Sequence, residues 1–207
     1  HELGDRLVLV IAGAGLALTA AIALATFVKV LGIGLLGRGR EIKGGVPLGN
    51  AVAVWEQASP SAVAQTAVAR WSQSAGHWGA PQVVQTSTLR GSNPQLAVAA
   101  DGSSTVVWTQ SESNGTLTIQ SSHRTTATGA WSAPQALSPA TGVSGGNWPQ
   151  AQADPGGNVI VLWQQYRSVG VYSMDAARYD ATSGQWSKPV HIETLMTAGN
   201  AYPFACA

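Results

Sequence analysis

Short apolar runs alternate with stretches rich in Gly, Ser, Thr, Asn and Gln from residue 49 to the end of the chain. Runs of this length, bounded by turn residues, predict β-strands. In the last complete segment we expect strands over 150–153, 159–164 and 171–179, and a fourth strand starting near Trp186. The second of these is apolar at successive positions, which is typical of a strand buried on both faces.

Four markers recur at nearly one spacing, which indicates an internal repeat. A tryptophan ends an apolar run at Trp55, Trp108 and Trp163, and another follows each of them by 23 residues, in a Gly-x-Trp-x-x-Pro motif. Arginines and prolines keep nearly the same period: Arg70, Arg124 and Arg178 are 54 residues apart, and Pro94, Pro149 and Pro203 are 55 and 54 apart. A fixed period of this size is typical of propellers and repeat arrays.

Each repeat of about 54 residues has room for four short strands. Asn114-Gly115 lies between the second and third strands of its repeat, where it predicts a tight hairpin. Four antiparallel strands per repeat make the blade of a β-propeller. The predicted fold is therefore mainly β, a partial propeller of about three blades. The domain covers 49–207, with repeats at 49–90, 91–145 and 146–199 and a fourth starting at 200–207.

The amino-terminal segment has a different character. Leu7 to Val28 is an uncharged apolar run of 22 residues, and Val30 to Leu36 continues it after Lys29. A helix of this length spans a hydrocarbon core of about 30 Å. We predict one transmembrane helix within 1–40, embedded through residues 7–36, and a linker or junction at 41–48. A signal peptide and a buried core helix are the alternatives.

Residues 49–207 resemble the sialidase-like propeller repeats of bacterial exported proteins. The resemblance rests on Pro-Gln-x-x-x-Asp followed by Gly-Asn-x-x-x-x-Trp, as in Pro149–Trp163, and on the Gly-x-Trp-Ser-x-Pro motif. That motif is similar to the Asp-box turn but departs from it, because its glycine stands two residues before the tryptophan instead of three. The resemblance implies a propeller and, more weakly, a glycosidase.

Residues 5–40 resemble a helix of the antiporter-like membrane subunits of formate hydrogenlyase and group 4 hydrogenases, which are related to respiratory complex I. The resemblance rests on Leu18–Arg40. It implies a proton-translocating subunit, in which Lys29 would take part in proton transfer. The alternative is that Lys29, near the end of the helix, extends to the membrane interface.

The two segments conflict in topology. Arg38, Arg40 and Lys43 follow the apolar run, and the positive-inside rule would place the repeats in the cytoplasm. Repeats of this kind are usually exported, so we predict a membrane-associated protein with an extracellular repeat region and leave the conflict open. The first repeat also lacks a counterpart of its first strand. These two features motivate the hypothesis that the chain is a truncated or chimeric fragment.

The candidate catalytic residues mostly obey the repeat, which favours structural roles for them. A sialidase-type site needs an arginine cluster for a carboxylate and a Tyr–Glu pair. Arg70, Arg124 and Arg178 recur once per repeat on the third strand. No glutamate stands in a matching motif with Tyr166 or Tyr172, and Glu56 and Glu112 have no partner pattern. We therefore predict no catalytic residue.

Metal, cofactor and nucleic-acid sites are not predicted either. Asp101 and Asp154 are expected to cap turns, and His123 is expected to be a surface or packed residue. Asn114-Gly115-Thr116 also reads as a glycosylation sequon, although we favour the turn. Cys206 is the single cysteine, so no disulfide forms within the chain. The net charge is +1 with 10% charged residues, which does not suggest a nucleic-acid-binding protein.

These patterns favour a non-enzymatic binding or adhesion propeller, membrane-anchored or exported, with a protein or carbohydrate ligand. One alternative is a fragment of a sialidase-like glycoside hydrolase, so enzymatic activity is left open. Another is a fragment of a proton-translocating membrane subunit. Because three blades cannot close a ring, we expect the isolated chain to be poorly stable or to aggregate.

Overall fold

The computed structural model describes residues 51–59, 63–72, 74–85, 87–126, 129–138 and 145–196. All regular structure within these ranges is β, in antiparallel sheets joined by turns. No helix long and apolar enough to cross a membrane occurs in this part of the chain. The predicted membrane segment, residues 7–36, lies outside it.

The first sheet contains four strands, β1 (Val52–Ala58), β2 (Ala64–Ser72), β3 (His77–Trp78) and β4 (Gln82–Val83). β1 pairs with β2, and β2 pairs with the two short strands that follow it. These strands correspond to the second, third and fourth strands of the repeat. A first strand would precede residue 51, outside the described residues.

The second sheet has a complete set of four strands in the order of the chain. They are β5 (Gly91–Val98), β6 (Ser104–Ser111), β7 (Leu117–Arg124) and β8 (Gln135–Ala136). The predicted hairpin joins β6 to β7, where Gly115 has φ 82° and its amide donates to the Glu112 carbonyl, 2.9 Å away. Glycine adopts this left-handed conformation without steric cost.

The third sheet adds a strand to this pattern. Its members are β9 (Gly146–Ala153), β10 (Val159–Ser168), β11 (Val171–Asp180), β12 (Gln185–Trp186) and β13 (Val190–Met196). The four predicted strands are present, but β9 begins earlier and β10 ends later than the apolar pattern indicates. The fourth strand, predicted to start near Trp186, is divided into β12 and β13, which pair with opposite ends of β11.

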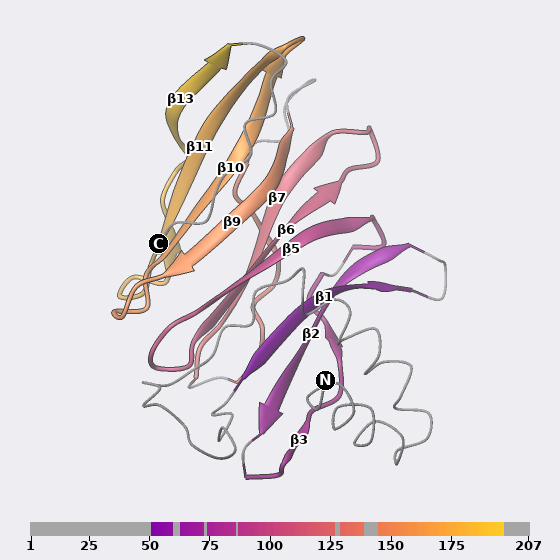
Figure 1. Cartoon of the computed structure of the whole chain (residues 1–207), viewed down its shortest axis with the longest axis vertical. Coiled ribbons are helices and arrows are strands. Elements are labelled where there is room, and N and C mark those ends of the chain that lie inside the picture. The colour runs from indigo at the N-terminus through magenta and orange to yellow at the C-terminus, as the bar shows by residue number, and fades with distance from the viewer. Residues whose placement is uncertain are drawn as a thin grey trace, which may run out of the picture.

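The three sheets follow one another in chain order, with β5 next to β1 on one side and next to β9 on the other (Figure 1). We call the contact between the first two sheets the first seam; its core contains Val54, Val68, Val84, Val106 and Trp108. The contact between the last two sheets is the second seam; its core includes Val107, Ile119, Val161 and Trp163. Trp108 and Trp163 are fully buried, so these two repeating tryptophans pack between sheets as expected.

A glycine at the start of each complete sheet allows the seams to close. A Cβ atom on Gly146 would lie 2.7 Å from Ile119 Cγ1 and 3.1 Å from Trp163 Cδ1. Gly91 occupies the same place at the first seam, against the side chains of Gln85, Thr66 and Trp108. At each of these glycines, the first strand of the sheet therefore lies closer to the preceding sheet than a residue with a side chain would permit.

The prediction that the strand at 159–164 is buried on both faces is wrong for β10, although its counterpart β6 does have this burial. Every residue of β6 from Ser104 to Gln110 is buried. In β10, Val161 and Trp163 are fully buried, whereas Ile160 is 47% exposed. The reason is the position of the sheets: β6 lies between two seams, and β10 faces only one within the described residues.

The first strands of the second and third sheets, β5 and β9, carry the same irregularity. Asn93 and Trp148, each directly before a proline, have φ values of 51° and 50°, and both lie where the pairing register shifts. The Asn147 side-chain oxygen accepts hydrogen bonds from Trp148 N at 2.9 Å, Thr109 Oγ1 at 3.1 Å and Asn93 Nδ2 at 3.2 Å. These bonds hold the bulges of the second and third sheets together.

Candidate functional site

Two hollows open side by side along the second seam. One is lined mainly by rings and the other by charged groups, and we call them the aromatic hollow and the charged hollow. Gln135 lines the first and Ala136 the second, so the short strand β8 marks the boundary between them. Their volumes are about 540 Å³ and about 550 Å³, each large enough for a small organic group.

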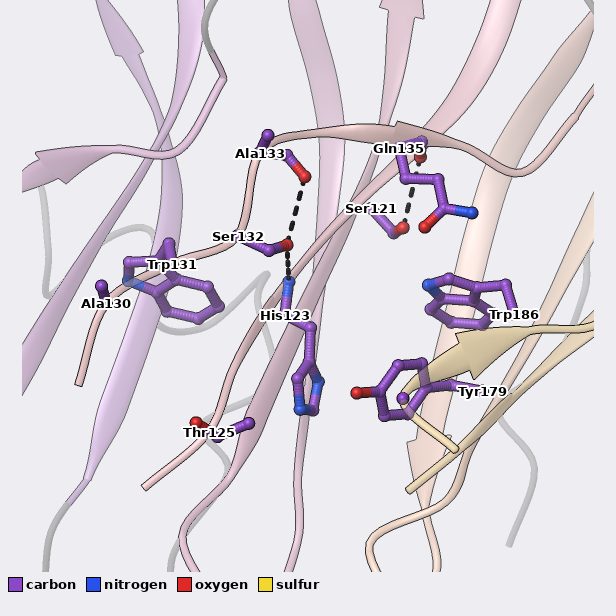
Figure 2. Close-up of a pocket in the computed structure, with 11 residues that line it drawn as sticks. Ser121, His123, Thr125, Ala130, Trp131, Ser132, Ala133, Gln135, Tyr179 and Trp186 are labelled. Carbon is purple, nitrogen blue, oxygen red and sulfur yellow. Dashed lines mark hydrogen bonds between the residues drawn. The ribbon is translucent and has the colours of Figure 1, made fainter. Parts of the chain in front are cut away.

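Four rings contributed by two sheets surround the aromatic hollow. Figure 2 shows Trp131 on one side, Trp186 and Tyr179 on the other, and His123 between them. The His123 and Tyr179 rings are 4.3 Å apart and tilted by 31°, and the Tyr179 and Trp186 rings are 5.4 Å apart. Tyr179 is 7% exposed and belongs to the core of the second seam, so these ring contacts rest on a fixed support.

The imidazole of His123 is held in place from two sides. Its Nδ1 lies 2.8 Å from Thr105 Oγ1, and its backbone amide donates to Ser132 Oγ at 3.0 Å. Burial lowers the pKa of His123, against a smaller opposing effect of the Asp101 carboxylate. The ring is therefore neutral at pH 7. Burial, together with the charge of Asp180, raises the pKa of Tyr179, so its phenol is protonated at the same pH.

Polar groups at the edge of the hollow are oriented by the backbone. Ser121 Oγ donates to the Gln135 carbonyl at 3.2 Å, and Ser132 Oγ donates to the Ala133 carbonyl at 3.1 Å, as Figure 2 shows. The Gln135 side chain is exposed. The hollow thus combines apolar ring faces with hydroxyl and amide groups. None of the described residues that line it carries a carboxylate.

The charged hollow contains a buried carboxylate with three polar neighbours. Asp175 is 3% exposed, and Arg167 Nη2 donates to both of its oxygens, at 2.7 and 2.6 Å. Ser173 Oγ donates to Asp175 Oδ1 at 2.8 Å, and His191 Nδ1 lies 3.5 Å from the same oxygen. Lys188 also lines this hollow. Asp175 is fixed and charge-compensated, as a buried carboxylate must be.

These charged residues depart from the repeat. Asp175 is the cross-strand partner of Trp163, a position filled by Ala67 and Gln120 opposite the equivalent tryptophans. Arg167 lies in the late part of β10 that the apolar pattern did not predict, and His191 lies on β13. Sequence reasoning missed this group. The break in the repeat at Asp175 was the available signal.

The charged hollow has groups suited to proton transfer and to binding polar ligands. A carboxylate beside Nδ1 of a histidine can orient the ring. The cations of Arg167 and Lys188 outnumber the single carboxylate among the described lining residues. No group of three or more His, Cys, Asp or Glu side chains that could hold a metal ion occurs in the described ranges.

The three repeating arginines lie on third strands, as predicted, but they do not share one register. Arg70, His123 and Arg178 are the cross-strand partners of Val52, Thr105 and Ile160, each three residues before a tryptophan. Arg124 is therefore one residue beyond the arginine position, and His123 occupies that position in the second sheet. Arg178 pairs with Asp180 at 3.3 Å in an exposed contact.

The two glutamates considered earlier have structural partners. Glu56 Oε1 accepts a hydrogen bond from the backbone amide of Asn93 at 2.9 Å, which links the first sheet to the second. Glu112 Oε1 accepts from Thr118 Oγ1 at 2.6 Å and from Gln110 Nε2 at 3.0 Å, beside the hairpin. Neither glutamate lines one of the two hollows.

Asp101 and Asp154 occupy turns, as expected. Asp101 accepts from the amide and the hydroxyl of Ser103, at 2.8 and 2.7 Å, and the hydroxyl bond is the main cause that lowers the pKa of Asp101. Asp154 accepts from Asn158 in the same way. Tyr166 and Tyr172 are cross-strand neighbours whose rings are 5.4 Å apart. His123 is packed, at the second seam.

Comparison with known proteins gives structural likeness only. No protein-family model matches the chain, and no curated protein matches it. Among solved structures, a Hadza microbial sialidase is 9% identical with a TM-score of 0.49 over 70% of this chain. An endo-arabinase from Bacteroides thetaiotaomicron is 16% identical with a TM-score of 0.46 over 72% of this chain.

The matched regions make up 35% of the sialidase chain and 59% of the endo-arabinase chain, so this chain spans only part of either protein. No finding supports the resemblance of residues 5–40 to a membrane subunit. Likeness at this level assigns neither a family nor an activity to the chain.

Proposed function

We propose that the three described sheets are blades of a β-propeller and that the second seam binds carbohydrate. The observation that carries this proposal is the set of four rings around the aromatic hollow. Trp131 and Trp186 come from the same position of two successive repeats, and His123 and Tyr179 lie between them. Two neighbouring repeats thus supply the walls of one site.

Sugars match this combination of surfaces. A pyranose or furanose ring presents C–H groups on its faces, which pack against aromatic rings, and hydroxyl groups around its edge, which need polar partners. Tyrosine and tryptophan offer a large apolar area with little conformational freedom to lose. The exposed Gln135 amide and Ser132 hydroxyl are at the edge where a sugar would need hydrogen bonds.

The test is titration of the chain with a panel of neutral glucan, mannan, xylan and arabinan oligosaccharides, followed by calorimetry and tryptophan fluorescence. Trp186→Ala and Trp131→Ala should each raise Kd about tenfold, equivalent to about 1.4 kcal/mol. Trp78→Ala is the matched control. Trp78 has the same position in the first repeat, but it packs edge-on against Trp71, with ring centroids 5.9 Å apart, outside the hollow.

Binding that survives both substitutions in the hollow, or that weakens equally in Trp78→Ala, would place the ligand elsewhere. No binding to any member of the panel would remove the proposal for neutral carbohydrates. A milder pair of variants, Gln135→Ala and Ser132→Ala, changes exposed polar groups at the edge of the hollow. If these two variants also weaken binding, the cause is a lost contact with the ligand and not a disturbed core of the seam.

A glycoside hydrolase is the second candidate function, and Asp175 is the observation that favours it. Glycosidases use carboxyl groups as acid, base or nucleophile. Asp175 is a fixed carboxylate in the hollow next to the aromatic one, with an imidazole 3.5 Å away. Release of reducing sugar from the same oligosaccharides, lost in Asp175→Asn, would support hydrolysis. Binding without release would leave the binding module as the function.

We also propose that the chain is attached to a membrane through residues 7–36, with the repeats on the extracellular side. The uncharged run of Leu7 to Val28 supports attachment. The three cations after the run argue for the opposite orientation. Protease treatment of intact cells that express the chain distinguishes the two: extracellular repeats are digested, and cytoplasmic repeats are protected.

A further inference from the structure

Two arginines from different sheets meet at the first seam. Val54 and Val68 belong to the core of that seam, and Arg70 follows Val68 by two residues on β2. Alternate residues of a strand lie on the same face, so Arg70 also faces the first seam. Its backbone carbonyl is bonded to the Gly79 amide at 2.7 Å, which fixes this part of the strand.

Arg124 reaches the same seam from the other side. Val106, in the core of the first seam, pairs with Ser122, and Ser104 pairs with Arg124, so these residues share one face of the second sheet. His123 lies on the opposite face, where it contacts Tyr179 at the second seam. Arg70 and Arg124 therefore stand at the first seam where His123 and Tyr179 stand at the second.

The pair Arg70 and Arg124 occupies the same positions in its two repeats as the pair His123 and Tyr179 occupies in the next two. The first member stands fifteen residues after the strand tryptophan of one repeat, and the second stands sixteen residues after the tryptophan of the next repeat. At the second seam these positions hold two stacked rings, 4.3 Å apart. At the first seam they hold two guanidinium groups, which repel each other. Burial lowers the pKa of Arg70, and the charge of Arg124 lowers it further.

Within the described residues, the guanidinium groups of both arginines are only partly paired. The Nη1 atoms of both Arg70 and Arg124 are buried and make no hydrogen bond. Arg124 Nε donates to the Gly129 carbonyl at 2.8 Å. No salt bridge in the described part of the chain includes either residue, whereas Arg178 has Asp180 two residues later. The corresponding residues here are Ser72 and Thr126, which carry no charge.

We propose that Arg70 and Arg124 form a binding site for an oxyanion at the first seam. The ligand class is a carboxylate, sulfate or phosphate group, held by donors from both guanidinium groups. The planar fork of an arginine matches these oxyanions, and a shared anion cancels the repulsion between two cations. Both side chains are only half-buried, so solvent has access to the pair.

The site is independent of carbohydrate binding at the second seam. It would persist if the aromatic hollow bound nothing, because it rests on Arg70, Arg124 and the absence of an acidic partner among the residues that the structure describes. The experiment uses the full 207-residue chain and follows thermal unfolding with sodium sulfate, phosphate or acetate added at constant ionic strength. The three salts distinguish a tetrahedral dianion from a planar carboxylate.

The expected result is a saturable rise in Tm with at least one of the three anions, as for a ligand that binds the folded state. Arg70→Gln and Arg124→Gln should abolish the saturable part. Arg178→Gln, at the exposed pair with Asp180, should retain it. Sulfate and phosphate also stabilise proteins without binding, but that effect does not saturate and is common to all variants.

A second readout separates this site from a purely structural pair. Without added anion, Arg70→Gln and Arg124→Gln remove a repulsion and should unfold at the same temperature as the wild type or a higher one. A fall in Tm of either variant in chloride alone would mean that the arginines stabilise the seam by themselves. That result, or equal saturation in all four proteins, would overturn the proposal.

Discussion

The side-chain amide of Asn93 donates a hydrogen bond to the side-chain oxygen of Asn147, 3.2 Å away and 54 residues further along the chain. Asn93 lies on β5 and Asn147 on β9, the first strands of successive sheets. Glu56 accepts a hydrogen bond from the Asn93 backbone amide at 2.9 Å. One chain of hydrogen bonds therefore joins all three described sheets. The sheets are thus connected by polar groups as well as by the apolar seams.

Loss of the Asn147 side chain should weaken this connection. Asn147→Ala removes one acceptor of three hydrogen bonds and leaves Thr109 and the strained Trp148 amide without it. We expect a loss of about 1–3 kcal/mol in the free energy of unfolding, measured by urea denaturation. Gln152→Ala, at an exposed position of the same strand, is the control and should change stability by less than about 0.5 kcal/mol. Equal effects of the two would contradict a role for Asn147.

Close approach at the second seam depends on Gly146. Gly146→Ala would place a methyl group 2.7 Å from Ile119 Cγ1, so the sheets must move apart. Overpacking of this kind costs about 1–3 kcal/mol, which thermal unfolding detects. Gly79→Ala is the control, because a Cβ atom there would lie 3.6 Å from its nearest neighbour, an ordinary contact. An unchanged Tm in Gly146→Ala would show that the seam adjusts freely.

The Arg167–Asp175 pair should matter more for stability than the Arg178–Asp180 pair. Removal of Arg167 leaves a carboxylate that is 4% exposed without its main partner, whereas both members of the second pair are exposed. We expect Arg167→Ala to cost about 1–3 kcal/mol and Arg178→Ala at most about 1 kcal/mol. In the double variant Arg167→Ala with Asp175→Ala, much of the loss should be recovered. Additive losses would mean that the two groups are not coupled.

His123 should make stability depend on pH. Its pKa in the folded protein lies below the ordinary value of 6.5, because burial disfavours the charged ring. The unfolded chain therefore binds a proton at higher pH than the folded chain. The contribution of His123 to the free energy of unfolding is fully present above pH 6.5. It is lost as the pH falls through the pKa of His123 in the folded protein.

Urea denaturation at pH 8 and pH 5 measures this effect. His123→Gln should lose less stability than the wild type between these two values. Asp101→Asn removes the charge that opposes the shift, so it should make the dependence on pH steeper than in the wild type. Identical differences between pH 8 and pH 5 in all three proteins would exclude His123 as the cause.

The spacing of the tryptophans was sufficient to predict the sheets, because each marks a strand whose neighbours follow at fixed distances. The period of the arginines concealed a difference of one residue. Arg124 is 54 residues from both other arginines, but in the strand pairing it takes the position of the residue that follows each of them. A one-residue difference reverses the face of a strand on which a side chain lies. Only the pairing of β6 with β7 shows that His123 and Arg124 serve different seams.

The charged hollow could not have been assembled from sequence. Asp175 lies on β11, Arg167 near the end of β10, and His191 on β13, five residues after Trp186, where only the start of a strand was predicted. Their contacts depend on the pairing of β11 with both neighbours. The departure of Asp175 from the repeat was visible beforehand, but it did not identify the partners.

The placement of paired positions on opposite sides of a seam has a consequence for how such a chain diversifies. The aromatic hollow takes its walls from two repeats, and the Arg70 and Arg124 pair likewise comes from two sheets, so a middle repeat contributes to the seam before it and to the seam after it. Duplication, deletion or exchange of a repeat therefore creates a new junction, with a chemistry that neither parent junction possessed. In this chain the order of the repeats, as much as their content, determines which side chains face each other across a seam.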